Sequence, residues 1–288
     1  GIAITTRASE IVVANSSAGA VTLPELLLAA TERIEVRAGS RLAASASDDS
    51  ASPEVITSES SGALIRLSGT GASRIDRGAA SSASGDVLIA AGASLLADAA
   101  LLIDATRSTT SQGLLRAGGS GGGLGRGAGG SGGAGGSLSL ASSQVNLGDT
   151  ANALGPLTGL VLTNSDLASF GALDELVLRG YEAIDLIGTT TLGSAQLASL
   201  VLETPLLRGQ ATASGQAAQA NIAARSVELV NNSSAQAAAS LGSGAGTGNN
   251  SLTVQAERLR LGDGDKAIGG FATTRLAATD SVRSAGEG

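Results

Sequence analysis

The core of this chain must be built almost without aromatic side chains. Its 288 residues include two Phe, one Tyr and no Trp, although 42% of the residues are hydrophobic. A globular core of this length normally gains much of its buried area from aromatic rings. Small and branched aliphatic side chains must therefore fill the interior, which favours many small, closely stacked repeats.

The composition predicts a folded chain despite its 42 glycines. Only 15% of the residues are charged and the net charge is -7. Unfolded chains combine low hydrophobicity with high net charge, whereas the mean hydropathy here is +0.24. The glycines and the Ala/Ser tracts are then expected at bends and loops of a repeat structure.

One pattern of alternating apolar residues recurs and closes on a small residue before a second apolar pair. It occurs at residues 138–148 (LSLASSQVNLG) and 252–262 (LTVQAERLRLG), and again at Leu200, Leu202, Thr204 and Leu207, and at Ile222, Ala224, Val227 and Leu229. A variant with one more residue at the corner occurs at Leu176, Leu178, Gly180, Ile184 and Leu186, at Ile34, Val36, Ala38 and Leu42, and at Val87, Ile89, Ala91 and Leu95.

Period-two alternation predicts short strands with one buried face, and the closing small residue is expected inside a tight corner. Copies begin roughly 16 to 32 residues apart, commonly about 22, which is typical of one turn of a solenoid. The sequence therefore predicts an all-β parallel β-helix (β-solenoid) with turns of about 20–24 residues. About a dozen stacked turns would make a rod of roughly 60 Å.

We expect the whole of 1–288 to be a single β-helix segment of a longer chain, because the sequence begins at Gly1, lacks Met and shows no signal segment. Residues 118–136 are Gly-rich and predict an exposed loop, with similar excursions at 241–250 and 44–61. The alternative is helical: 23–37 and 215–230 are rich in Ala and Leu and could form amphipathic helices.

Several stretches resemble the large filamentous-haemagglutinin-like exoproteins of bacteria. They are residues 159–164 (GLVLTN), 176–185 (LVLRGYEAID) and 252–288 with its Gly269-Gly270-Phe271, so that the resemblance covers about 138–288 well. It implies a right-handed β-helix, export through an outer-membrane secretion partner, and a role in adhesion, biofilm or surface filaments. The chain has no Cys, which agrees with secretion without disulfides.

The residue inventory argues against an enzyme, and we predict no catalytic, cofactor-binding or metal site. Without His or Cys there is no Ser-His or Cys-His pair and no imidazole ligand. The acidic pairs Asp48-Asp49 and Asp174-Glu175 are adjacent, so their side chains should point to opposite faces of a strand. Arg179, Arg225 and Arg258 are expected on the solvated face.

Three other features could suggest sites, and each has a structural explanation. The run 262–265 (GDGD) resembles a calcium-binding turn but occurs once, which favours a tight turn between strands. The Asn pairs at 231–232 and 249–250 are expected at strand ends, where Asn can adopt the left-handed conformation or form a ladder. Phe170, Tyr181 and Phe271 should fill corners or gaps in the core.

The expected partners follow from charge and pattern. Lys266 is the only lysine and no basic, aromatic-bearing stripe occurs, so nucleic-acid binding is not expected. The apolar stretch 87–103 is broken by Gly92, Ser94 and Asp98, and we expect no membrane span. Since an uncapped solenoid presents open strand edges at its ends, self-association end to end or laterally is expected.

Three functions remain open at this stage. The first is a secreted structural protein that forms surface or extracellular filaments. The second is an adhesin module that binds a glycan or host surface through its loops. The third is a polysaccharide lyase or hydrolase that uses carboxylates and arginines.

Overall fold

The computed structural model describes residues 3–15, 21–45, 54–58, 60–71, 73–77, 82–118, 135–232 and 248–285. They belong to two compact units, Gly1–Ser142 with Ala172–Leu176 and Ser143–Gly171 with Val177–Gly288. Most of the predicted loops at 118–136 and 241–250 lie outside the described residues. The loop expected at 44–61 is wrong in part, because this segment contains a strand at Glu54–Ser58. The expectation of one continuous segment over 1–288 concerns both units together and stays a prediction.

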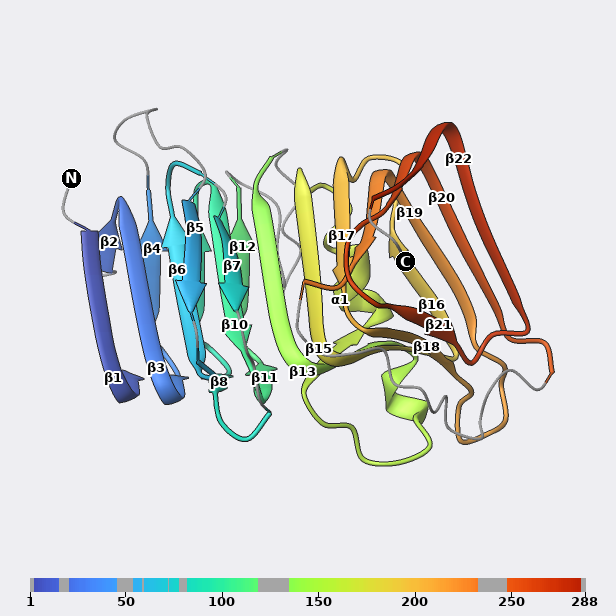
Figure 1. Ribbon diagram of the computed structural model, residues 1–288. Helices are drawn as coiled ribbons and strands as arrows, with labels where there is room; N and C mark the ends of the chain where they lie inside the picture. Colours follow the sequence, from blue (N-terminus) through green and yellow to red (C-terminus); the bar gives the residue numbers. More distant parts are fainter. Residues whose placement is uncertain are drawn as a thin grey trace. The chain divides into compact units, whose positions relative to one another are not determined.

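The first unit is built from strands (Figure 1). They are β1 Ala3–Val13, β2 Val21–Leu23, β3 Glu25–Val36, β4 Arg41–Ala44, β5 Glu54–Ser58, β6 Ala63–Ser68, β7 Ser73–Arg77, β8 Asp86–Ile89, β9 Ser94–Ala97, β10 Ala100–Ala105, β11 Ser108–Ser111, β12 Leu114–Ala117 and the start of β13 Ser137–Gly148.

Parallel pairing places like residues over like residues in the first unit. Strands β4, β9 and β12 align Leu42, Leu95 and Leu115, whose exposures are 3%, 0% and 0%. The same register aligns Ala44 with Ala97. Because neighbouring parallel strands lie about 4.8 Å apart, each aliphatic side chain packs directly on its equivalent in the next strand. This stacking forms the core that the shortage of aromatic residues predicts.

The corner between the longer and shorter strands differs from the prediction. Ala38 and Ala91, expected inside it, lie on an exposed turn, whereas Ser40 and Ala93 are buried. The turn closes through the bonds from Ser40 N to Arg37 O and from Ala93 N to Ala90 O. It contains Gly39 and Gly92 at φ of 78° and 80°, a conformation that glycine adopts without strain.

Strand β6 shows that the prediction of a wholly parallel structure is wrong at one place. It lies between β3 and β10 and is antiparallel to both, yet it aligns Ile65 with Leu28 and Ile103. Alternation of period two is the same in either chain direction, so β6 fills the column of core residues without revealing its reversed course. The other face of β6 is covered by β5 and β7, which are parallel to each other.

An apolar cluster holds this cover in place. Leu64 of β6, Ile75 of β7 and Leu102 of β10 are buried together, and Leu27 and Ile56 pack against them. The segment that separates β4 from β8 is therefore folded onto the outside of the first unit's sheet.

In the second unit, strands β17, β19, β20 and β22 lie side by side in this order (Figure 1). Its elements are the end of β13, the 3-10 helix η1 Thr150–Asn152, β14 Leu160–Thr163, α1 Asn164–Ala168, β15 Glu175–Ile187, β16 Thr189–Gly193, β17 Ser199–Glu203, β18 Leu206–Gln210, β19 Gln219–Val230, β20 Ser251–Leu261, β21 Ala267–Gly269 and β22 Thr273–Ser284.

The registers of the second unit confirm most of the predicted repeats. Strands β19 and β20 align Ile222 with Val254 and Ala224 with Ala256, as the sequence pattern predicts. One alignment is wrong: Leu200 pairs with Val227, the second part of the pattern, and not with its beginning. Both halves of a turn share the same alternation, so a short strand such as β17 fits either half.

The helical alternative is wrong for both segments that suggested it. Residues 25–36 and 219–230 are the strands β3 and β19. The short helix α1 begins instead at a capping box, in which Thr163 Oγ1 accepts from Asp166 N and Thr163 N donates to Asp166 Oδ2. The described part of the chain is therefore all-β, with mostly parallel pairing.

Two adjacent leucines of β12 test the stacked core. Leu115 is 0% exposed whereas Leu114 is 39% exposed. We expect Leu115→Ala to lower the free energy of unfolding by about 2–5 kcal/mol, because it leaves a cavity in the column, and Leu114→Ala by less than about 1 kcal/mol. Chemical denaturation of both variants measures the difference, and equal losses would contradict the column.

Candidate functional site at the β22 edge

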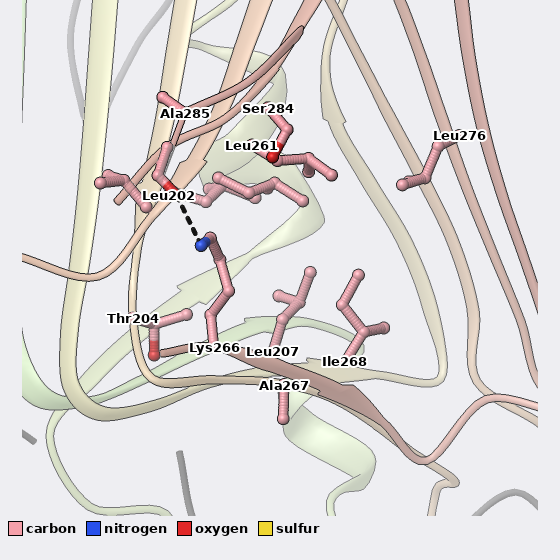
Figure 2. A pocket seen from close by; sticks show the side chains of 13 residues that line it. Leu202, Thr204, Leu207, Leu261, Lys266, Ala267, Ile268, Leu276, Ser284 and Ala285 are labelled. Carbon is pink, nitrogen blue, oxygen red and sulfur yellow. Dashed lines mark hydrogen bonds between the residues drawn. The ribbon is translucent and has the colours of Figure 1, made fainter. Parts of the chain in front are cut away.

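An apolar cavity of about 340 Å³ lies in the second unit (Figure 2). Most of its wall is formed by aliphatic side chains of strands between β17 and β22. Lys266 is the one charged residue among those that line it. The lining residues are Leu202, Thr204, Leu207, Leu229, Val230, Leu261, Gly262, Lys266, Ala267, Ile268, Leu276, Ser284 and Ala285. A closed protein core contains few voids of this size, because side chains fill them. The core of the second unit is therefore not fully packed at this place.

Lys266 holds the turn between β20 and β21. Its Nζ donates to Gly262 O at 2.6 Å, the dashed line in Figure 2, and to Gly264 O at 2.8 Å. Gly264 has a φ of 82°, and a side chain there would collide with Asn231 O. The predicted tight turn at 262–265 is therefore present, and glycine is required at its tightest point.

The same turn is poorly arranged for calcium. An ammonium group already takes the two carbonyl oxygens, and Asp263 and Asp265 are exposed. Within the described ranges, no group of three or more His, Cys, Asp or Glu side chains lies close enough together to hold a metal ion. The Gly/Asp pattern is explained by the turn and its lysine.

Strand β22 leaves the core column uncovered on one side. The register aligns Leu200, Val227, Leu259 and Val282, whose exposures are 0%, 0%, 1% and 59%. β22 pairs with β20, and no other strand among the described residues pairs with it. Among the described strands, β22 therefore lies at an edge of the sheet and carries an exposed member of the core column.

Charges on β22 are also unsatisfied. Glu228, Arg260 and Arg283 are directly aligned on β19, β20 and β22, and Glu228 forms an ion pair with Arg260 at 3.3 Å. Arg283 therefore lies next to another arginine, and in the described ranges it has no acidic partner. Like charges on adjacent strands are unfavourable, so this edge is suited to an incoming carboxylate.

Strand β1 has the corresponding features in the first unit. Of the described strands, only β3 pairs with it, and Arg7, Ala8 and Glu10 are exposed. Neither Arg7 nor Glu10 forms an ion pair with a described residue. Sequence analysis did not single out these charges, because their significance depends on which strands lie at an edge.

Ion pairs join neighbouring strands. Arg208 donates to both oxygens of the fully buried Asp185 at 2.8 and 2.9 Å. Hydrogen bonding to Asp185 is the main cause that raises the pKa of the Arg208 guanidinium above its ordinary value. The two side chains thereby join β15 to β18.

Arg179 corrects a prediction. It was expected on the solvated face, but its side chain is 9% exposed and lies 2.7 Å from Glu203, whose side chain is 7% exposed. Its guanidinium also lies 5.7 Å from the centre of the Tyr181 ring. Arg225 and Arg258 are exposed, as predicted.

The acidic and amide pairs have structural roles. Glu175 accepts from Ser137 Oγ at 2.9 Å and from Arg74 at 3.2 Å, and Asp174 accepts from Gly136 N. Asp48 and Asp49 lie outside the described residues. The buried Asn250 accepts from Ala218 N and donates to Gly270 O, so it bridges segments before and after it in the stack.

Asn231 and the aromatic residues also serve the fold. Asn231 donates from its side chain to Asp265 O at 2.6 Å. Phe170 is 0% exposed and Tyr181 is 7% exposed. Phe271 packs on Gly209, where a Cβ atom would lie 2.4 Å from the ring. All three aromatic rings fill gaps, as predicted.

Comparison with protein-family models, curated proteins and solved structures finds no match to this chain. The resemblance to filamentous-haemagglutinin-like exoproteins therefore stays a prediction. No helix within the described ranges is long and apolar enough to span a membrane. The function must be argued from the geometry.

The buried pair of Arg179 and Glu203 provides a test of how charge is used. We expect Arg179→Met to lower the free energy of unfolding by about 3–5 kcal/mol, because it leaves the Glu203 carboxylate buried without its partner. The double variant R179M/E203L removes both charges and should recover most of that loss. Chemical denaturation measures both, and an equal loss in the two variants would show that the pairing is unimportant.

The turn at 262–265 predicts that calcium does not stabilise the protein through this site. Adding millimolar calcium should leave the melting temperature of the wild type and of D263N/D265N equally unchanged, because Lys266 already binds the carbonyl oxygens. Thermal melts with calcium and with a chelator make the measurement. A calcium-dependent rise that D263N/D265N abolishes would contradict this account.

Proposed function

We propose that the chain is a right-handed parallel β-helix with turns of about 20–24 residues, lengthened by insertions, and that it acts as a stiff structural element. The proposed location is the bacterial cell surface or an extracellular filament, where it would serve adhesion, biofilm or surface coating. The resemblance to secreted exoproteins is the source of this location and of the suggested outer-membrane secretion partner.

The observation that carries the proposal is the alignment of equivalent residues across successive strands. Leu95 aligns with Leu115, 20 residues later, and Val254 with Leu276, 22 residues later. Longer steps, such as the 32 residues from Ile222 to Val254, contain an insertion but keep the register. A coil whose turns stack in this way gains length with every turn, and its rigidity comes from continuous hydrogen bonding.

The use of charge also supports a structural role. Arg179 and Arg208 are joined to Glu203 and Asp185, which are 24 and 23 residues away. These pairs connect neighbouring turns. Catalysis of glycoside cleavage requires two carboxylates that face one bond, and the buried carboxylates here are each matched by an arginine instead.

Electron microscopy of the native, unfractionated assembly tests this function. We expect rods with a repeat of about 4.8 Å along the axis, either single or bundled. Activity on a panel of acidic polysaccharides would instead support a lyase or hydrolase. Compact particles without the axial repeat would overturn the β-helix itself.

A second candidate function rests on the polar face of the second unit. This face consists of Thr189, Thr191, Gln219, Asn221, Ser251 and Thr253, aligned on β16, β19 and β20. None of these side chains ionises, and their hydroxyl and amide groups lie in rows about 4.8 Å apart. A neutral polysaccharide surface could bind to such a row of donors and acceptors, which would make the protein an adhesin.

The adhesin alternative predicts retention on insoluble neutral polysaccharide. Lysine substitution at the polar face, N221K/T253K, should abolish the binding because it introduces charge into the face, whereas the control S226K on the other half of β19 should not. A pull-down with quantified free protein measures it. Equal binding of both variants, or none by the wild type, would remove this candidate.

A further inference from the structure

We propose that the apolar cavity of the second unit binds an aliphatic carboxylate, a fatty acid of medium chain length (Figure 2). The tail of this ligand would lie among the leucines of the cavity, and its carboxylate would accept a hydrogen bond from Lys266 Nζ. All the residues that line the cavity belong to the second unit. The site therefore goes beyond the structural function proposed above and does not depend on it.

The cavity arises because its two walls hold different numbers of strands. Strand β19 lies between β17 and β20 on one wall, so Leu202, Leu229 and Leu261 form an aligned row of three. On the other wall β18 pairs directly with β21, which aligns Leu207 with Ile268. In Figure 2 these two side chains lie below the cavity, on the opposite side from Leu261. Two side chains cannot cover three at the density of a protein core, so the strand pairing itself leaves a space.

The size and the lining of the cavity select the tail. A methylene group takes about as much space as a water molecule, whose share of liquid volume is about 30 Å³, so a volume of about 340 Å³ holds roughly ten carbon atoms. Apolar cavities of this kind stay dry and bind apolar molecules. None of the lining residues is aromatic, so a planar ring would find no stacking partner. A flexible hydrocarbon chain suits the space better.

Lys266 selects the head group. An ammonium group has three donors, and Gly262 O and Gly264 O take two of them at 2.6 and 2.8 Å. The third donor has no partner among the described residues, and Lys266 forms no ion pair with any of them. A carboxylate would accept the third hydrogen bond and supply the opposite charge, and such a charge-assisted bond is stronger than a neutral one.

The position of Lys266 suits a ligand with one charged end. Lys266 and Ile268 are half-buried, whereas Leu202 and Leu207 are buried. A ligand with its carboxylate on Lys266 therefore keeps its charged end near water while its tail lies among the buried leucines. The hydroxyl of Thr204 does not compete for the head group, because it accepts from the backbone N of Leu206 and donates to the O of the same residue.

Titration calorimetry with decanoate at neutral pH tests the cavity. The wild-type chain should bind decanoate saturably. The variant I268F should weaken this binding at least about tenfold, because the larger ring takes the space of the tail. The matched control is V282F, since Val282 lies on β22 but does not line the cavity. V282F should bind decanoate like the wild type.

A ligand of opposite charge tests Lys266. Decyltrimethylammonium has a tail of similar length and a cationic head, so the wild type should bind it at least about tenfold more weakly than decanoate. In K266M this preference should fall to less than about threefold, because the ammonium group is gone. The ratio of the two affinities is the readout, since a disturbed turn at 262–265 would weaken both ligands alike.

Thermal melts by circular dichroism establish that each variant is folded. If I268F does not melt cooperatively, L261F fills the cavity from the other wall in its place. No saturable binding of decanoate by the wild type, or equal binding by the filling variant and V282F, would overturn the site. An unchanged preference for decanoate in K266M would overturn the role of Lys266. The axial repeat seen by electron microscopy tests the proposed structural function separately from all these outcomes.

Discussion

Parallel stacking in register is the constraint on which the rest of the structure depends. Once neighbouring strands are about 4.8 Å apart, each interior side chain must fit between its equivalents above and below. Leu42, Leu95 and Leu115 satisfy this, and so do the smaller Ala44 and Ala97. With only two Phe and one Tyr in the chain, these columns are filled mainly by Leu, Ile, Val and Ala.

The same constraint decides where charges can be placed. A buried carboxylate is tolerated when an arginine on a neighbouring strand binds it, as Arg208 binds Asp185 and Arg179 binds Glu203. These pairs therefore constrain the register between the strands. Among the described strands, the aligned residues Glu228, Arg260 and Arg283 end at β22 on an arginine without an acidic partner.

The sequence predicted the type of structure because alternation and repeated spacing reflect the stacking directly. It correctly aligned Ile222 with Val254, and Ile34 with Val87. The alternation of apolar residues indicates neither the direction of a strand nor its place within a repeat. The antiparallel strand β6 was therefore missed, and Leu200 was assigned to the first half of the repeat when it belongs to the second.

The arginines that bind buried carboxylates could have been predicted from a second pattern in the sequence, which is separate from the pattern of apolar residues. Arg179 and Glu203 are 24 residues apart, Arg208 and Asp185 are 23 apart, and both separations are close to the predicted repeat. A search for opposite charges at the repeat spacing would have found them. The edge charges on β1 and β22 could not be recognised in this way, because their importance depends on the absence of a neighbouring strand among the described residues.

The stacked register is the central claim, and spin labels test it most directly because the chain contains no cysteine of its own. Asn221 and Thr253 are aligned on β19 and β20, and Asn221 is exposed. Labels on N221C/T253C should lie about 5 Å apart and show strong spin exchange, whereas labels on N221C/R275C, two strands apart at about 10 Å, should show only dipolar broadening. Non-interacting spectra from N221C/T253C would contradict the register and, with it, the proposed β-helix.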